Sequence, residues 1–304
     1  MSAVEADGGA AVAPVGAIEI GGSHVAAALV DADAGRLLTP IERRPLDPAG
    51  ARDEIIGALL SAARAVAQPA GRRWGVATPG PFDYAAGVSR IRGVAKLDAL
   101  YGTDLRAVLA GALAVAPPEV RFINDADAFL LGEAWRGAAR GAARAMAITL
   151  GTGLGSAFLI DGRIVDRGAG VPPEGRLDLV AFRGGPVEER ISARALRRAH
   201  AVLAPDRPAA DVADIAARAR GGEDASTRVF TDFGSQLGEF IAPRLAEFEA
   251  DCLVIGGSIA GAWDLFGAAV LDALGEAVAG GQVRLAEQPA AAALLGAARH
   301  ASEG

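Results

Sequence analysis

The pair Asn124-Asp125 is the clearest candidate for chemistry in this sequence, because it directly follows the short apolar run 120–123. A carboxylate at the carboxyl end of a buried strand can reach into a cleft and accept the proton of a hydroxyl group that attacks phosphorus, while a neighbouring amide orients the same substrate. A structural role is also open, since Asp125 or Asp127 would serve as the N-cap of a helix predicted to begin near Ala128. The two interpretations are compatible if Asp127 is the cap.

Three glycine-rich turns follow predicted strands and could each hold an anion. Without Cβ atoms the backbone can approach a phosphate closely and direct successive N–H groups at it, and hydroxyl side chains add donors. Each turn taken singly could instead only close a tight hairpin. Three such turns in order favour phosphate binding, although the sequence has no phosphate loop of the lysine-containing Walker type. The turns are Gly21-Gly22-Ser23, Gly151-Thr152-Gly153-Leu154-Gly155 and Gly256-Gly257-Ser258.

Three further carboxylates are candidates for binding. Glu19 lies between two isoleucines in the strand before the first glycine turn, where water-mediated binding of Mg²⁺ would explain its charge. An outward-facing position on an alternating strand is the other interpretation of Glu19. Glu174 and Glu188 lie in a region rich in glycine and proline and could accept hydrogen bonds from sugar hydroxyls, or they could be solvated surface charges.

Other reactive residue types offer less. The three histidines are scattered without metal-ligand spacing, and the single cysteine lies in the apolar run 252–255, so the sequence predicts neither a zinc site nor a disulfide. The three tryptophans are predicted to pack rather than to stack on bases. The basic pair Arg197-Arg198 is predicted to lie on a solvated helix face.

The surrounding pattern predicts a duplicated α/β unit. Residues 15–30 and residues 145–165 each form an apolar strand pair bent at a glycine-rich turn. Residues 50–68 have the apolar spacing of a helix and precede a short strand at 74–77. Residues 187–249 are predicted to be mainly helical. Strands 120–123 and 253–255 each end at one of the candidate sites.

Composition limits the class of protein. A chain of 304 residues exceeds the size at which one core stops growing, so two lobes are expected. Apolar residues make up 51% of the chain and aromatic residues 5%, which suits an α/β protein. The net charge of −7 argues against a nucleic-acid or acidic-membrane partner. The first residues are small and acidic, and no apolar stretch reaches spanning length, so a cytoplasmic protein with a loose N-terminal tail is expected.

Taken in order, these segments resemble the ROK family of bacterial sugar kinases, and the likeness runs from about Val15 to Ala301. GAIEIGGSH resembles the first phosphate turn of that family, and ITLGTGLGSAFLIDGRI resembles the second. GVATPGPFD resembles the family's loop near the sugar, and INDADAFLLGE resembles its catalytic segment. VEERISARAL resembles the helix that follows the family's zinc loop. LVIGGSIAGAWDLF resembles the turn on the adenosine side, and AALLGAARHA resembles the closing helix.

The resemblance implies a two-lobed, ribonuclease-H-like fold of the actin-like ATPase class that closes on sugar and ATP, and a homodimer. It implies 15–122 with 289–304 as the small lobe, 123–288 as the large lobe and 1–14 as a disordered tail. It implies ATP-dependent phosphorylation of a hexose or hexose derivative, at the 6-hydroxyl, with Asp125 as base and Mg²⁺ near Glu19. The three glycine turns would contact ATP. The sugar ligands it implies are Asn124, Glu174, Glu188 and the loop residues Thr78, Pro79 and Gly80.

The chain departs from the family pattern in three places. The family's zinc-binding cysteines are replaced by Leu179, Ala181 and Pro186, and its zinc-binding and sugar-contacting histidine by Leu177, so this loop is expected to be held by packing without zinc. Glu19 stands where the family usually has Asp. The segment 90–105 lacks the usual Pro-Asn pair.

Two other functions remain open. A regulatory or sugar-sensing ROK homologue would bind ligand without efficient turnover, although the first strand at about Val15 leaves no room for a DNA-binding domain. A scaffolding actin-like ATPase would leave the segment TPGPFD and the Asn124-Asp125 pair without a purpose. The choice of sugar, the choice between ATP and polyphosphate, and the oligomeric state are not determined by these patterns.

Overall fold

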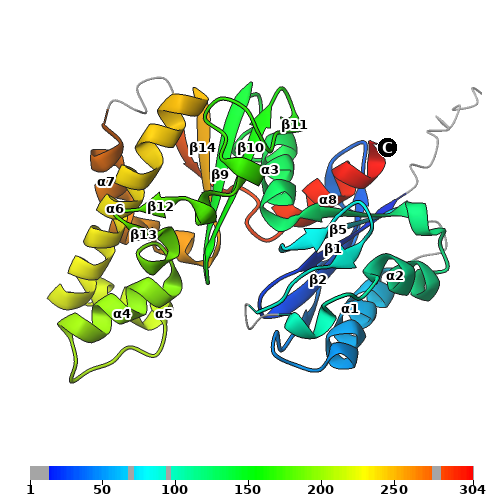
Figure 1. Ribbon diagram of the computed structural model, residues 1–304, viewed down its shortest axis with the longest axis horizontal. Coiled ribbons are helices and arrows are strands. Elements are labelled where there is room, and N and C mark those ends of the chain that lie inside the picture. The colour runs from blue at the N-terminus through cyan, green and yellow to red at the C-terminus, as the bar shows by residue number, and fades with distance from the viewer. Residues whose placement is uncertain (1–13, 68–71, 94–96, 276–281, 304) are drawn as a thin grey trace, which may run out of the picture. The chain divides into compact units, whose positions relative to one another are not determined.

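The computed structural model describes residues 14–67, 72–93, 97–275 and 282–303 (Figure 1). The predicted tail therefore lies outside the described residues, apart from Pro14. The chain divides into two compact units, Met1–Phe122 with Ala297–Gly304, and Ile123–Gly296. Each contains one main sheet and its own hydrophobic core.

The first unit is built on a six-stranded sheet with the order β3-β2-β1-β5-β8, in which β4 also pairs with β2. Strands β1 and β2 form the predicted antiparallel hairpin, and β5 joins β1 in parallel. Helix α1 packs on β1, β2 and β4 through the residues that the helical spacing indicated, among them Ile55 and Leu59. The elements are β1 (Val15–Ile20), β2 (His24–Asp31), β3 (Arg36–Leu37), β4 (Glu42–Pro45), α1 (Arg52–Val66), β5 (Trp74–Thr78), β6 (Phe82–Asp83), β7 (Val88–Ser89), α2 (Leu105–Leu113) and β8 (Val120–Asn124).

The second unit repeats this plan in a five-stranded sheet with the order β11-β10-β9-β14-β15. Strands β9 and β10 are antiparallel, and β14 joins β9 in parallel, as β5 joins β1 in the first unit. The prediction of a duplicated α/β unit is therefore confirmed. The elements are α3 (Asp125–Arg136), β9 (Arg144–Leu150), β10 (Leu154–Ile160), β11 (Arg163–Ile164), β12 (Ala181–Phe182), β13 (Gly185–Pro186), α4 (Ala193–Leu203), α5 (Val212–Arg220), α6 (Asp224–Phe248), β14 (Cys252–Gly256), α7 (Trp263–Leu274) and β15 (Gln282–Leu285). The last helix, α8 (Ala292–Ser302), begins in this unit and ends in the first.

Helices cover the second sheet and complete its core. Helix α3 packs on β9 and β10, and helices α6 and α7 run beside one another (Figure 1), with α4 and α5 packed on α6. The core holds fully buried aromatic side chains such as Phe158, Phe230 and Phe266. Their burial fixes the positions of the strand ends at which the candidate site is built.

The boundary at which the chain returns to the first unit lies within helix α8, further along the sequence than expected. Residue 289 was the expected boundary, but the second unit extends to Gly296. The physical reason is a close crossing of α8 over α3: a Cβ atom on Gly132 would overlap the carbonyl of Ala292, and one on Gly296 would overlap the carbonyl of Ala128. The start of α8 is thus packed into the second unit.

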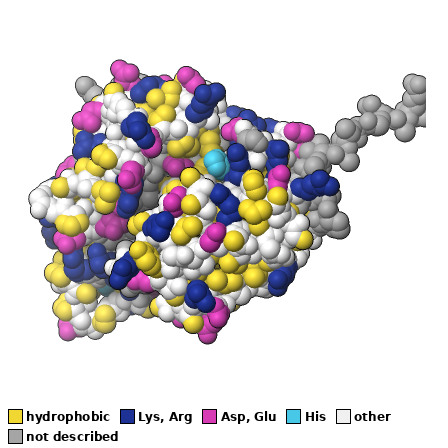
Figure 2. Space-filling view, turned by 45° about the vertical axis from the view of Figure 1, so that its right-hand side comes forward, with side chains coloured by type: hydrophobic (Ala, Val, Ile, Leu, Met, Phe, Trp, Pro, Cys, Tyr) yellow, Lys and Arg dark blue, Asp and Glu magenta, His cyan; other side chains and the backbone are white. Residues whose placement is uncertain are grey.

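The surface carries charges of both signs. On the face drawn in Figure 2, basic and acidic side chains are interspersed. Fifteen ion pairs link charged side chains of the described residues, and most are exposed, such as Arg220 with Asp264. Exposed pairs of this kind contribute little to stability. Within the described part of the chain, no helix is both long and apolar enough to cross a lipid bilayer.

Candidate active site

Asp125 is the first residue of α3 and directly follows the last residue of β8. The helix begins here because Asn124 has extended backbone angles and its side-chain Oδ1 accepts hydrogen bonds from the N–H groups of Ala126 (2.9 Å) and Asp127 (3.3 Å). The interpretation of Asp125 or Asp127 as the N-cap of a helix that begins near Ala128 is therefore wrong: the helix begins at Asp125 and its cap is Asn124. The positive end of the helix dipole favours the negative charge of a carboxylate at this position.

Asp127 occupies the first turn of the same helix. Burial raises the pKa of Asp127 to about 7, and the negative charges of Asp125 and Asp166 add to the rise. Near neutral pH, Asp127 is therefore partly protonated. In its protonated form it carries no negative charge at this end of α3.

The β9–β10 turn, the second glycine turn of the sequence, lies against the start of α3. Strand β10 packs on α3, and the point that a Cβ atom on Gly155 would occupy lies 3.4 Å from the Cβ atom of Ala126, an ordinary van der Waals distance. The same atom would overlap the hydroxyl of Thr149 on the paired strand β9, so the absence of a side chain at Gly155 makes room for Thr149. The turn itself closes with a hydrogen bond from Gly151 N to Gly153 O (3.0 Å). Asp125 and the second glycine turn therefore lie in the same unit, on neighbouring elements.

The third glycine turn lies beside the second. Gly257 has a φ of +85°, a conformation that residues with a side chain rarely adopt, and a Cβ atom there would overlap the Leu150 carbonyl. The hydroxyl of Ser258 lies 3.6 Å from the point that a Cβ atom on Gly151 would occupy. Because β9 and β14 are parallel neighbours, their carboxyl ends bring the two turns together.

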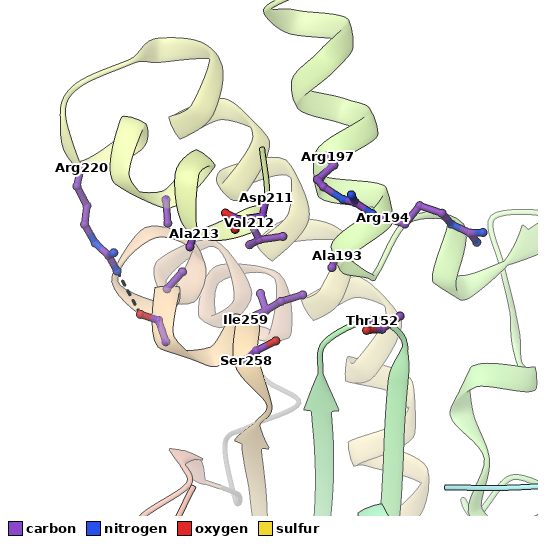
Figure 3. A pocket seen from close by; sticks show the side chains of 13 residues that line it. Thr152, Ala193, Arg194, Arg197, Asp211, Val212, Ala213, Arg220, Ser258 and Ile259 are labelled. Atoms are coloured by element: carbon purple, nitrogen blue, oxygen red, sulfur yellow. Dashed lines mark hydrogen bonds between the residues drawn. The ribbon is translucent and has the colours of Figure 1, made fainter. Parts of the chain in front are cut away.

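A cavity of about 500 Å³ opens at these two turns (Figure 3). Thr152 and Ser258 lie at the strand ends, and helices α4 and α5 form the opposite wall. Small apolar side chains make up much of the lining, together with charged side chains. The charged lining residues are Arg194, Arg197, Asp211 and Arg220.

The sequence did not indicate these charged lining residues. Arg197 is exposed on α4, as the predicted solvated helix face requires, and it also lines the cavity together with Arg194, one helical turn earlier. Neither guanidinium forms an ion pair with a carboxylate of the described residues, whereas Arg220 bonds Asp264 and the Gly261 carbonyl. The spacing of three between the two arginines, directly after the 188–192 segment, is the feature that could have indicated them.

Glu188 contacts the β9–β10 turn. Its Oε1 accepts a hydrogen bond from the backbone N–H of Leu154 at 2.9 Å. The carboxylate lies so close to the turn that a Cβ atom on Gly153 would overlap it. Glu188, which was predicted as a sugar ligand, is thus a direct neighbour of the second glycine turn.

The loop around Glu174 is held by packing and by one hydroxyl. Ser156 of β10 donates to the Gly175 carbonyl (2.6 Å) and accepts from the Leu177 N–H (2.9 Å). Leu177 itself is 0% exposed and belongs to the core of the second unit. Glu174 is exposed, with a positive φ of 59°. No group of three or more His, Cys, Asp or Glu side chains able to hold a metal ion occurs among the described residues.

In the first unit, Glu19 and Thr78 lie at the same edge of the sheet. Strands β1 and β5 are parallel and pair Glu19 with Ala77, so the residue after Ala77 lies next to the end of β1. The first glycine turn closes with a hydrogen bond from Gly21 N to His24 O (2.9 Å), and Ser23 is exposed on it.

The predicted sugar loop 78–80 is held by Tyr84. The Tyr84 hydroxyl donates to the carbonyl of Thr78 at 3.2 Å, and a Cβ atom on Gly80 would lie 3.4 Å from that hydroxyl. Thr78 is buried, whereas Pro79 is half-buried and Gly80 is exposed. The first unit thus holds Glu19, the first glycine turn and the 78–80 loop. The second unit holds the remaining candidate residues.

Comparisons with known proteins agree over nearly the whole chain. A model of the ROK family matches residues 15–303. The N-acetyl-D-glucosamine kinase of Pectobacterium carotovorum subsp. carotovorum (strain PC1) is 26% identical over 261 residues, covering 79% of this chain and 82% of that protein. The bifunctional enzyme NanE/NanK of Brucella melitensis biotype 1 is 32% identical over 289 residues, covering 94% of this chain and 53% of that protein. This chain therefore spans about half the length of the Brucella relative.

A solved structure supports the fold. The crystal structure of a ROK hexokinase from Thermus thermophilus has a TM-score of 0.76 and 27% sequence identity, and the match covers 96% of this chain and 100% of that one. The predicted two-lobed, ribonuclease-H-like fold class is thereby confirmed.

Proposed function

The chain belongs to the ROK family, and on that premise we propose that it is an ATP-dependent kinase that phosphorylates the 6-hydroxyl of a hexose or hexose derivative, with Asp125 as general base. The observation that carries the proposal is the arrangement within the second unit. Asp125 begins α3, and α3 packs on β9 and β10 with Ala126 of its first turn facing Gly155 of β10. The proposed proton acceptor and the proposed phosphate-binding turn therefore belong to one compact unit.

Asp125 accepts the proton of the attacking hydroxyl as the bond to the γ-phosphorus forms, and the ADP oxygen leaves on the opposite side. Asn124 fixes the position of this carboxylate by capping α3, and its side chain also orients the sugar. Glu174, Glu188 and the 78–80 loop hold further sugar hydroxyls. Binding and orientation by these groups supply most of the rate enhancement, because phosphoryl transfer needs little covalent assistance from the protein.

The cavity in Figure 3 takes the adenosine part of ATP. Its small apolar side chains suit a flat base, and Thr152 and Ser258 at its strand ends supply hydroxyl donors to the phosphates. Arg194 and Arg197 have no carboxylate partner among the described residues and are therefore available to the negative charge of the donor.

Mg²⁺ is the cofactor that use of ATP implies. Glu19 suits binding of this ion through its water ligands rather than by direct coordination. Mg²⁺ keeps several water ligands and is held by one or two carboxylates together with substrate phosphates. Glu19, half-buried at the end of β1, provides one such carboxylate. The ion would neutralise charge on the phosphates during transfer.

Conditions in the cytoplasm, where ATP and Mg²⁺ are available, suit this activity, and the family resemblance favours a homodimer. A regulatory homologue is the second candidate function. It is favoured by two replacements, Glu19 for the usual Asp and buried Leu177 for the usual sugar-contacting histidine.

The test is release of ADP from MgATP in the presence of hexoses, amino sugars and N-acetyl sugars in turn, with a sugar-free reaction as the baseline. The kinase proposal predicts sugar-dependent ADP release and a phosphorylated product whose phosphate is at the 6-position. Binding of sugar and of nucleotide without ADP release would instead support the regulatory homologue.

A further inference from the structure

The segment 188–193 holds the β9–β10 phosphate turn at both of its ends. At one end, Glu188 Oε1 accepts the N–H of Leu154 (2.9 Å). At the other end, the N–H of Ala193 donates to the carbonyl of Gly151 (2.9 Å). The position of the turn therefore depends on this one short segment.

The segment is itself fixed by Ser192. The buried Ser192 hydroxyl donates to the carbonyl of Glu188 (2.6 Å) and accepts from the N–H of Ala195 (3.1 Å), so it closes the segment and caps α4 at once. Backbone bonds from Arg190 and Ile191 to the Val187 carbonyl add to this closure. Glu188 is consequently presented to the turn by a backbone that has little freedom.

The second carboxylate oxygen of Glu188, Oε2, does not bind the turn. Oε2 accepts no hydrogen bond from the described residues, whereas Oε1 is bound to the turn. Gly153 leaves the space that the carboxylate fills, since a Cβ atom there would overlap it. One carboxylate thus has one oxygen on the phosphate turn and one oxygen available for a ligand.

We propose that Glu188 is a positioning residue that couples the two substrates: Oε1 orders the phosphate turn for the nucleotide while Oε2 accepts a sugar hydroxyl. The inference rests on the proposed function for its sugar half. A sugar that holds the Glu188 carboxylate in place also holds its hydrogen bond to Leu154 in place. Each substrate therefore lowers the conformational-entropy cost of binding the other. Coupling of this kind is reciprocal, and the two ligands must raise each other's affinity by the same factor.

The experiment is calorimetric titration of the wild-type chain with Mg-AMPPNP, with and without a saturating concentration of the sugar that gives the fastest turnover. We expect the sugar to tighten AMPPNP binding by a factor within the usual range for such coupling, about 5- to 150-fold. Glu188→Ala should weaken sugar-free AMPPNP binding about tenfold, since the hydrogen bond that the Leu154 N–H donates to the carboxylate is lost, and should remove most of the coupling.

Two further variants separate positioning from a general loss of structure. Glu188→Gln retains an oxygen that can accept the Leu154 N–H, so it should restore sugar-free AMPPNP affinity close to that of the wild type while sugar affinity remains reduced. Glu189→Ala removes the adjacent, exposed carboxylate and should leave both affinities unchanged.

The inference is overturned if Glu188→Ala binds AMPPNP as tightly as the wild type without sugar, or if it keeps the full coupling factor. It is also overturned if Glu188→Gln, folded with a wild-type melting temperature, fails to restore AMPPNP affinity. A wild-type chain that binds AMPPNP but none of the sugars would overturn the proposed function and the coupling with it, and the sugar-free titrations would then still decide whether Glu188 positions the turn.

Discussion

Asp125 and Asp127 lie two residues apart in the first turn of α3, where burial and then the charge of Asp125 raise the pKa of Asp127. Burial is the larger cause, and together with the charges of Asp125 and Asp166 it brings the pKa of Asp127 to about 7. An aspartate in the unfolded chain titrates near pH ~4. Between these two values the folded state binds more protons than the unfolded state, so Asp127 makes the free energy of unfolding fall as pH rises.

The first prediction is that Asp127→Asn removes this pH dependence. From about pH 4 to about pH 7, the stability difference between variant and wild type should grow in favour of the variant, and above pH 7 it should stay constant. Urea unfolding at closely spaced pH values measures it. Asp206→Asn, an exposed aspartate of the same unit, is the control and should run parallel to the wild type. Parallel curves for Asp127→Asn would show that the raised pKa is wrong.

A second prediction concerns Glu133, whose side chain is 0% exposed. Its carboxylate accepts three backbone hydrogen bonds, from Ala138 (2.7 Å), Glu287 (3.1 Å) and Gln288 (2.9 Å), and so ties the end of α3 to the segment before α8. Glu133→Ala leaves the buried Ala138 N–H and the part-buried N–H groups of Glu287 and Gln288 without this acceptor, so it should lower the free energy of unfolding by about 2 kcal/mol or more.

The matched control for Glu133 is Glu247→Ala. Glu247 forms an exposed ion pair with Arg244 three residues earlier on α6. Its removal should change the stability by less than about 1 kcal/mol. Equal effects of the two substitutions in the same chemical denaturation experiment would refute the structural role of Glu133.

A third prediction compares two glycines of one turn region. Gly257→Ala forces a side chain onto a positive φ and into the Leu150 carbonyl, so the melting temperature should fall by several degrees. Gly261→Ala should be close to neutral, because a Cβ atom there meets no other atom within 4 Å. Differential scanning fluorimetry of both variants is sufficient. A Gly257→Ala protein as stable as Gly261→Ala would mean that the turn does not have the described conformation.

A fourth prediction is that the Glu174 loop depends on packing. Leu177→Ala should lower the free energy of unfolding by about 2–5 kcal/mol, the usual cost of truncating a buried leucine. A zinc-selective chelator, by contrast, should leave the melting temperature of the wild type unchanged. A chelator-induced fall would show that a metal contributes to this loop.

The strand ends could be predicted from the sequence because short-range patterns determine them. The glycine turns after β1, β9 and β14 follow apolar runs, and the duplicated hairpin could be recognised from residues 15–30 and 145–165. The start of α3 was not predicted correctly. The sequence offered Asp125 or Asp127 as its N-cap, but the cap is Asn124, and this depends on backbone angles that only the junction of β8 with α3 sets.

Contacts between distant segments could not be predicted. Nothing in the local sequence relates Glu188 to Leu154 or Arg197 to Thr152, because the packing of α4 on the rest of the second unit creates these relationships. The same holds for the pKa of Asp127, which depends on Asp166 in the segment after β11. The boundary within α8 likewise follows from its close crossing with α3.

The measurement that tests the central claim most directly is the turnover number of Asp125→Asn with MgATP and the best sugar, beside Asp206→Asn as the control. Loss of a general base predicts a fall in kcat of about 10²- to 10⁴-fold, while the dissociation constant for AMPPNP stays near that of the wild type and Asp206→Asn remains fully active. A wild-type turnover number for Asp125→Asn would contradict its assignment as the base.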